Sequence, residues 1–189
     1  MTPVILASQS PRRSHLLQQA GIPFTVIVQP VEENWPDGMP VKEIPVHIAR
    51  NKALAVKATI QEDKRPIIAA DTVVVLQNTI IGKPTDRADA IGILLRLSGQ
   101  THTVITGVVL LHDAKETSFS ETTEVEFYEI SEEDAAFYVD TYQPYDKAGA
   151  YAIQEWIGIT AIRAIRGDFY NVMGLPVSRL HKVLKDLKN

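Results

Sequence analysis

The chain has 189 residues, of which 45% are hydrophobic and 22% charged, with a formal net charge of −4 and no cysteine. The negative charge argues against general binding to nucleic acid polymers, and the lack of cysteine excludes disulfides, thiolate zinc sites and cysteine nucleophiles. We interpret the composition as that of a globular protein of a reducing cytoplasm, without a signal peptide or a stretch long enough to span a membrane.

A short apolar run and the residues that follow it predict the first strand and the first helix. Residues 3–8 form a continuous apolar stretch, which predicts a buried strand. Ser10 is placed to cap a helix that has Pro11 at its first position and that ends before Gly21. The chain therefore passes directly from a strand into a helix.

The later elements are predicted from hydrophobic periodicity and turn residues. They are a strand at 24–29, a proline-rich loop at 30–45, a helix at 46–60, a strand, turn and return strand at 65–82, a helix at 87–99, a hairpin at 101–130, a helix opened by Ser131, a loop at 143–151, a strand at 157–165 and a helix at 176–188. Helices alternate with strands early and a hairpin dominates late. This order predicts an α/β fold with a mixed sheet.

Polar residues gather at the first strand-to-helix turn. A helix N-terminus presents unpaired N–H groups that suit a phosphate, and Ser8, Ser10, Arg12 and Arg13 strengthen such an anion site. The alternative is that both arginines lie on the solvent face of the helix and pair with nearby carboxylates.

Several charged residues stand out further along the chain. Asp71 interrupts an apolar strand, where a carboxylate costs several kcal/mol unless it is paired, binds a metal or bonds to backbone. Glu33, in the long loop, is a candidate ligand if a divalent cation is held near Asp71. Lys52, Lys83 and Lys147 lie near turns or on a helix, where lysines are usually solvated. The sequence contains no Walker-type loop, dinucleotide-binding turn or zinc-binding His pair.

In combination, these segments resemble the Maf family of nucleoside triphosphate pyrophosphatases, also called septum formation inhibitor proteins. The resemblance extends from Leu6 to Pro176 and is carried by "LASQSPRR", "VEE", "ARNKA", "AADTVV", "GKP", "LSGQTHTVITGV", "YDKAGAYAIQ" and "NVMGLP". The SPRR, ADT and GAYAIQ segments look like the branch that acts on dTTP and UTP. The resemblance implies a cytoplasmic hydrolase that releases a nucleoside monophosphate and pyrophosphate with the help of a divalent metal, Mg²⁺ or Mn²⁺.

The resemblance also implies roles for individual residues. Asp71 matches the proton acceptor of the family, and three positions match its specificity residues: Arg13, Thr72 and Gln154. The remaining pocket positions match Ser8, Arg12, Lys52 and Lys83, which suit phosphates, and Glu33, which with Asp71 suits the metal.

The chemistry of two of these residues leaves alternatives open. A carboxylate is a weak base at neutral pH, so Asp71 either takes a proton from the attacking water or positions the water and holds the metal. The Gln154 amide can match N3–H and O4 of thymine or uracil, whereas cytosine presents the opposite pattern. Because an amide can flip, Gln154 needs a neighbour that fixes its orientation.

The family further implies one α/β domain over residues 1–189, with a twisted mixed sheet, flanking helices and a cleft between two lobes, like inosine triphosphatases. Dimers are common in it, which leaves a homodimer open. Ala152 and Glu155 depart from the family pattern, which usually has glycines there, in the loop around Gln154. The resemblance therefore indicates the type of reaction better than it indicates the preferred base. The alternatives are the same reaction on other nucleotides, such as inosine or xanthosine triphosphate, and a nucleotide-binding regulator of cell division. Buried charges without a ligand would be destabilising, which favours the enzyme.

Overall fold

The computed structural model describes residues 2–60 and 63–187, and the chain divides into two compact units. The first unit runs through Asp71 and adds Thr106–Glu121 and the chain from Gly174 onward. The second unit consists of Thr72–Ile105 and Thr122–Met173. The boundary on the central strand thus falls directly after Asp71. The expectation of a single domain over the whole chain, and of a cleft, stays a prediction.

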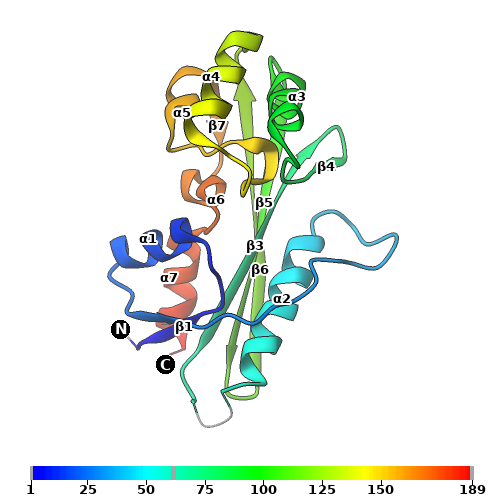
Figure 1. Ribbon diagram of the computed structural model, residues 1–189. Coiled ribbons are helices and arrows are strands. Elements are labelled where there is room, and N and C mark those ends of the chain that lie inside the picture. Colours follow the sequence, from blue (N-terminus) through cyan, green and yellow to red (C-terminus); the bar gives the residue numbers. More distant parts are fainter. Residues whose placement is uncertain (1, 61–62, 188–189) are drawn as a thin grey trace. The chain divides into compact units, whose positions relative to one another are not determined.

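Strands and helices alternate in the first half of the chain, as expected (Figure 1). The strands are β1 Val4–Leu6, β2 Phe24–Val26, β3 Ile67–Leu76, β4 Thr79–Ile81, β5 Thr101–His112, β6 Lys115–Phe127 and β7 Ile162–Arg166. The helices are α1 Pro11–Gln19, α2 Ile44–Lys57, α3 Arg87–Leu97, α4 Glu132–Tyr142, α5 Trp156–Thr160, α6 Phe169–Met173 and α7 Val177–Asp186, with a short 3₁₀ turn, η1, at Ala148–Ala150.

The strands of the described residues form one seven-stranded mixed sheet with the order β2-β1-β3-β5-β6-β7, and β4 pairs with β3. β1 runs parallel to both β2 and β3, whereas β3–β4 and β6–β7 are antiparallel. The predicted mixed sheet with flanking helices is therefore confirmed. The tight turn between β3 and β4 has positive φ at both Gln77 and Asn78, as a two-residue hairpin requires.

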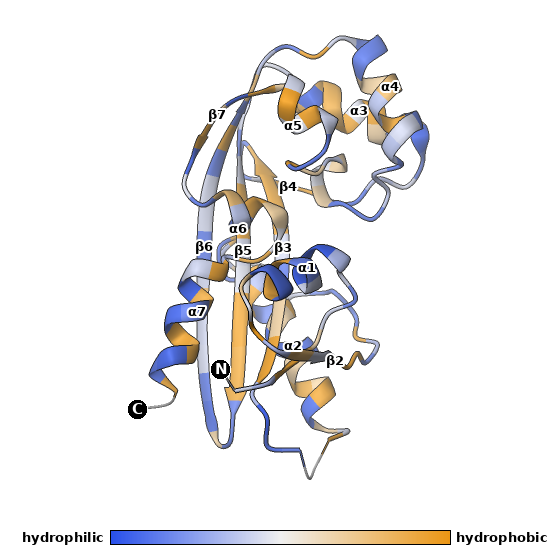
Figure 2. Cartoon of the chain, turned by 90° about the vertical axis from the view of Figure 1, so that its left-hand side faces the viewer, coloured by the Kyte–Doolittle hydropathy of each residue, from blue (hydrophilic) through white to orange (hydrophobic). Residues whose placement is uncertain are grey.

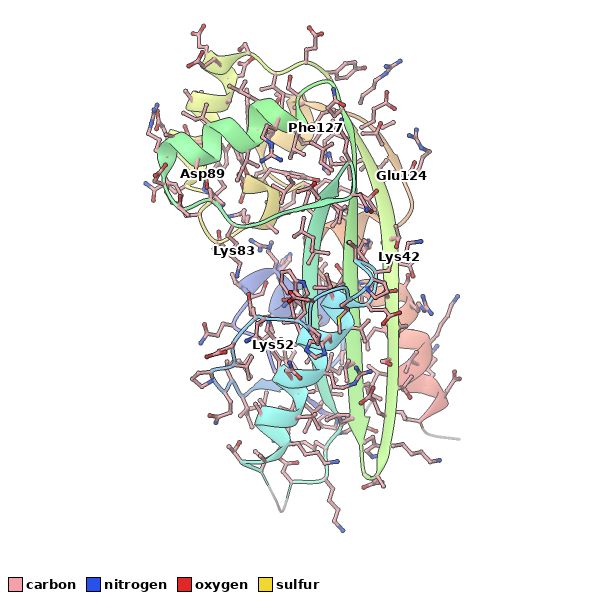
Figure 3. The ribbon with its side chains drawn as sticks, turned by 90° about the vertical axis from the view of Figure 1, so that its right-hand side faces the viewer. Lys42, Lys52, Lys83, Asp89, Glu124 and Phe127 are labelled. Carbon is pink, nitrogen blue, oxygen red and sulfur yellow. The ribbon has the colours of Figure 1, made fainter. Side chains whose placement is uncertain are left out.

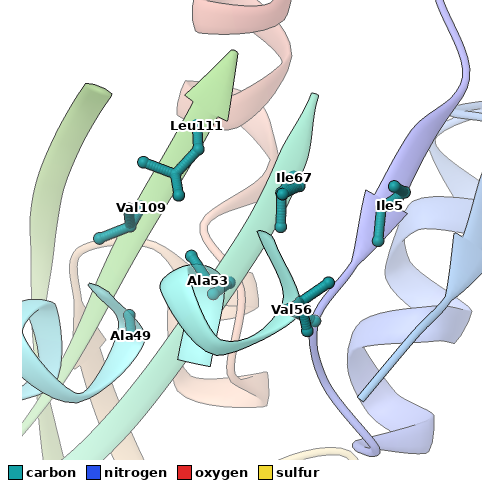
Figure 4. Packing of buried hydrophobic residues seen from close by; sticks show 9 residues of the cluster. Ile5, Ala49, Ala53, Val56, Ile67, Val109 and Leu111 are labelled. Atoms are coloured by element: carbon teal, nitrogen blue, oxygen red, sulfur yellow. The ribbon is translucent and has the colours of Figure 1, made fainter. Parts of the chain in front are cut away.

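The core of the first unit lies between its strands and α2. Ala49, Ala53 and Val56 are buried on α2 and pack against apolar side chains of β1, β3 and β5, including Ile5 and Val109 (Figure 4). Figure 2 shows the hydrophobic colour concentrated on β3 and β5, whereas much of β6 is hydrophilic. Central strands covered on both faces need mostly apolar residues, which explains the apolar runs that flank Asp71 and Thr72 on β3 and the run Val108–Leu111 on β5. This packing fixes the helix that carries Lys52.

The second unit is organised around α3 and α4, which pack against each other. Both helices begin as their sequences predict, because Asp86 and Ser131 accept hydrogen bonds from the backbone N–H groups of Asp89 and Asp134. The 3₁₀ turn η1 also packs on α3. The loop that carries Gln154 therefore begins directly after a turn that packs on α3.

Some predicted boundaries were wrong. The strand predicted at 157–165 begins only at Ile162, because residues 156–160 form α5. Gly158 explains the difference: a Cβ there would lie 1.7 Å from the Ile153 carbonyl oxygen, so this turn packs its backbone against the preceding loop. Ser10 is the N-cap residue of α1, but its side chain makes no capping hydrogen bond. Helix α6 was not predicted, and the last residue expected in the final helix, Lys188, lies outside the described residues.

Within residues 2–60 and 63–187, no helix combines the length and apolar character needed to cross a membrane.

Candidate active site

The turn between β1 and α1 is built around the Arg13 side chain. Arg13 is buried, at 8% exposure, and its Nε donates a hydrogen bond of 2.8 Å to the Gly174 carbonyl. Its Nη1 donates to Ser8 Oγ at 3.0 Å, and Ser8 Oγ also accepts the Ser10 backbone N–H at 3.2 Å. Arg13 is therefore not on a solvent face, and it ties the start of α1 to the segment that leads into α7.

The electrostatic surroundings of Arg13 include the candidate carboxylates. Burial lowers the pKa of Arg13, and the negative charges of Asp71 and Glu33 oppose that effect, while Arg12 adds to it. A buried guanidinium with donors in a fixed fork suits a phosphate or carboxylate partner.

Lys52 joins the two candidate metal ligands. Its Nζ lies 2.7 Å from Asp71 Oδ1 and 2.6 Å from Glu33 Oε1. Asp71 is buried in the middle of β3, Lys52 projects from α2 (labelled in Figure 3), and Glu33 comes from the loop before α2. Three separate segments of the first unit thus bring two carboxylates to one ammonium group.

Glu33 and Asp71 fit a cation that needs few protein ligands. Both are carboxylates that already converge on one positive charge, and hard oxygen donors suit Mg²⁺ or Mn²⁺. In the part of the chain that the structure describes, no group of three or more His, Cys, Asp and Glu side chains is placed to hold a metal. Two carboxylates suit an ion that completes its shell with water and phosphate oxygens.

In the second unit, the turn that carries Lys83 is joined to the YDKAGAY segment. The backbone N–H of Gly149 donates to the Gly82 carbonyl at 3.1 Å, next to Lys83. Gly149 has φ +74°, and a Cβ there would lie 3.0 Å from a methyl carbon of Val74 on β3. Lys83 itself is exposed (Figure 3). A glycine at this position lets two candidate site segments meet over the central strand.

The other two predicted specificity residues also belong to the second unit. Thr72 is half-buried on β3 directly after Asp71, and successive strand residues face opposite sides of the sheet. Gln154 is exposed in the loop between η1 and α5. An exposed amide is accessible to a ligand, as recognition of a base would require.

The predicted residues thus fall into two sets. The set of the first unit is Ser8, Arg12, Arg13, Glu33, Lys52 and Asp71, and that of the second is Thr72, Lys83 and Gln154. Contacts join Ser8 with Arg13, and Glu33 and Asp71 with Lys52. A pocket that combines both sets stays a prediction of the resemblance.

Polar residues that sequence reasoning left outside the site support the loop of Gln154. Lys147 is buried, at 9% exposure, and its Nζ lies 2.7 Å from Asp146 Oδ1. Tyr138, fully buried on α4, contacts both Ala152 and Glu155. Lys147 stands out in the sequence as a lysine between turn residues, whereas no sequence signal indicates that the Tyr138 hydroxyl points to this loop.

Comparison with known proteins shows the family of the chain. A family model described as Maf-like protein matches residues 3–187. The chain belongs to the Maf family. Maf proteins named dTTP/UTP pyrophosphatase are similar over nearly the whole length. The one from Phocaeicola vulgatus is 49% identical over 97% of this chain and 95% of that protein, and the one from Cytophaga hutchinsonii is 47% identical over 100% and 85%.

A third Maf relative, from Porphyromonas gingivalis, has the same name and is 45% identical over 97% of this chain and 93% of its own length. Among solved structures, the Staphylococcus aureus Ham1 protein matches 66% of this chain and 71% of its own, with 14% identity and a TM-score of 0.46. A likeness this weak carries no conclusion.

Proposed function

We propose that this Maf protein hydrolyses dTTP and UTP to the nucleoside monophosphate and pyrophosphate. The observation that carries the proposal is the convergence of Glu33 and Asp71 on Lys52. Asp71 and Arg13 are buried charged groups, and a buried charge is costly unless it is paired or serves a charged ligand. The names of the similar proteins, dTTP/UTP pyrophosphatase, indicate which ligand.

Basic side chains at the positions that match the family's phosphate-binding residues would bind the triphosphate. In the first unit, Arg12 and Lys52 supply positive charge, and Ser8, which already accepts two hydrogen bonds, has a hydroxyl proton to donate to a phosphate oxygen. In the second unit, Lys83 stands in a turn that Gly149 holds in place. These groups offset the negative charge of the substrate on a chain that is acidic overall.

Water then attacks the α-phosphorus. A new P–O bond forms, the bond from the α-phosphorus to the bridging oxygen breaks, and pyrophosphate leaves with that oxygen. Asp71 accepts the proton of the water or orients it, and Glu33 and Asp71 together would hold a divalent cation. When bound, such a cation withdraws charge from the phosphate oxygens and stabilises the leaving group.

The base would be read by the three residues that match the specificity positions of the family, Arg13, Thr72 and Gln154. Gln154 has one amide acceptor for N3–H and one donor for O4, the atoms that thymine and uracil share. Cytosine offers an acceptor and a donor instead, so a fixed amide rejects it.

The resemblance also supports a cytoplasmic location for this reaction and leaves a homodimer as the form to test. Light scattering at several protein concentrations would measure the mass of the particle. A mass near 21.0 kDa at all concentrations would argue against the dimer.

The function is tested by pyrophosphate release from a panel of nucleoside triphosphates with Mg²⁺ or Mn²⁺, with Asp71→Asn beside the wild type. We expect turnover of dTTP and UTP that is lost in the variant and in EDTA. Turnover of purine triphosphates instead would keep the reaction and replace the assigned substrates. Tight nucleotide binding without turnover of any of them would favour the regulator of cell division.

A further inference from the structure

The loop that carries Gln154 is fixed by a hydroxyl from a different element. Tyr138 lies on α4, and its hydroxyl accepts the backbone N–H of Ala152 at 3.1 Å. The same hydroxyl donates its proton to the Glu155 carboxylate. Ala152 is two residues before Gln154 and Glu155 is the residue after it, so one buried hydroxyl bonds the backbone before the amide and the side chain of the residue after it.

Further contacts restrain the same loop from its two ends. The Lys147 ammonium lies 3.8 Å from Glu155 Oε1, which joins the residue before η1 to the end of the loop. The backbone of Gly158, in α5, packs against the carbonyl of Ile153, where a Cβ would be only 1.7 Å away. Gln154 is therefore an exposed side chain on a backbone that is held at neighbouring positions before and after it.

A restrained backbone matters here because the amide of Gln154 has a donor and an acceptor on the same carbon. Reading a base requires that each group stays at its own place, since a flipped amide presents the pattern that suits cytosine and a displaced amide loses its bonds to N3–H and O4. Tyr138 and Glu155 have no need to contact the nucleotide to influence this. They would act through the position of Gln154.

We propose that Tyr138 and Glu155 are positioning residues that set the preference of this protein for bases with N3–H and O4 over cytosine. The inference rests on the proposed function, because it assigns the reading of the base to Gln154. The Tyr138 hydroxyl supplies the bridge, and the Glu155 carboxylate orients that hydroxyl so that its lone pair faces Ala152 N–H. Loss of either group releases the loop on one side of Gln154.

The first test is Tyr138→Phe, which removes the bridging hydroxyl and keeps the ring. We expect KM for dTTP and UTP to rise about three- to tenfold with kcat within about twofold, and the kcat/KM ratio of dTTP to CTP to fall by a similar factor. The matched control is Tyr142→Phe, because Tyr142 lies on the same helix, stacks on Tyr138 with ring centroids 5.0 Å apart and is partly exposed. It should keep the wild-type ratio.

The second test compares Glu155→Ala with Glu155→Gln. Alanine removes the acceptor of the Tyr138 proton and should lower the ratio of dTTP to CTP, whereas glutamine retains an oxygen acceptor and should restore it to within about twofold of the wild type. A merely structural role would lower the thermal midpoint and the active fraction equally for all nucleotides. An unchanged ratio in both Tyr138→Phe and Glu155→Ala overturns the proposal.

The two proposals fail in distinguishable ways. Absence of turnover by the wild type overturns the proposed hydrolysis, and equilibrium binding of dTTP and CTP then tests the positioning by itself. Binding that prefers dTTP in the wild type and loses that preference in Tyr138→Phe supports the inference. Equal binding of both nucleotides by the wild type overturns it.

Discussion

Lys52 Nζ lies 2.7 Å from Asp71 Oδ1, although the two residues are 19 positions apart and belong to α2 and β3. The same ammonium lies 2.6 Å from Glu33 Oε1. One positive charge therefore separates two carboxylates that would otherwise repel each other. This arrangement gives Lys52 two functions, stabilising the folded chain and contributing to the charge of the candidate site.

Removal of the Lys52 charge should make the protein depend on a divalent cation. In Lys52→Met the two carboxylates lose their shared partner, and we expect a loss of about 1–3 kcal/mol of unfolding free energy. Because Mn²⁺ would then occupy the place of the ammonium, it should raise the thermal midpoint of this variant more than that of the wild type. Lys57→Met, an exposed lysine of the same helix, is the control. Absence of an Mn²⁺ shift in both Lys52→Met and wild type would contradict the proposed cation site, and equal shifts would show that Lys52 does not compete with the cation.

A lysine at position 13 should not replace the two hydrogen bonds of the Arg13 guanidinium. Arg13 donates to the Gly174 carbonyl and to Ser8 Oγ from different nitrogens, and a single ammonium does not reproduce that geometry. We expect Arg13→Lys to lose about 1–3 kcal/mol in urea unfolding. Arg96→Lys, on the exposed side of α3, should change the unfolding free energy by less than about 0.5 kcal/mol. Similar losses of unfolding free energy in both variants would show that the two hydrogen bonds of the Arg13 guanidinium are not required.

The buried imidazole of His102 should make the protein sensitive to acid. Burial lowers the pKa of His102 to about 4, whereas an unfolded histidine titrates near pH 6.5. The unfolded chain then binds the proton more readily, so stability is lost as the pH falls from about 6.5 to 4.

Replacement by glutamine checks this, because Gln does not titrate and can still bond to the Tyr151 hydroxyl, which lies 2.7 Å from His102 Nε2. Between pH 7 and pH 4, the wild type should lose about 2–3 kcal/mol of unfolding free energy relative to His102→Gln. Parallel pH curves for the two proteins would refute the assignment.

Two glycines should respond in opposite ways to alanine. A Cβ at Gly107 on β5 would lie 2.2 Å from the backbone nitrogen of Val46, so Gly107→Ala must displace the start of α2 and with it Lys52. At Gly92, inside α3, a Cβ would meet nothing within 4 Å. We expect Gly107→Ala to unfold at lower temperature and Gly92→Ala to gain up to about 1 kcal/mol from helix propensity. Circular dichroism melts would measure both, and an unchanged midpoint for Gly107→Ala would be evidence against this packing.

Local patterns in the sequence were sufficient to predict the elements whose formation depends on nearby residues. The turn at Gln77–Asn78, the helix opened by Ser131 and the apolar strand around Asp71 follow from capping, turn chemistry and hydrophobic runs. The segment 157–160 was wrongly predicted as strand because its β-branched residues favour that structure. A contact decided otherwise, since the backbone of Gly158 packs on the Ile153 carbonyl and forms α5.

The candidate site was predictable as a set of residue types, because a carboxylate in an apolar strand and arginines at a helix start are anomalous by themselves. Their partners were not predictable, since a hydrogen bond joins atoms in space irrespective of their separation along the chain. The Lys52–Asp71 pair, the burial of Lys147 and the Tyr138 hydroxyl between Ala152 and Glu155 all depend on how helices pack on strands and loops. Composition and motif therefore identify the charges, whereas packing determines which of them meet.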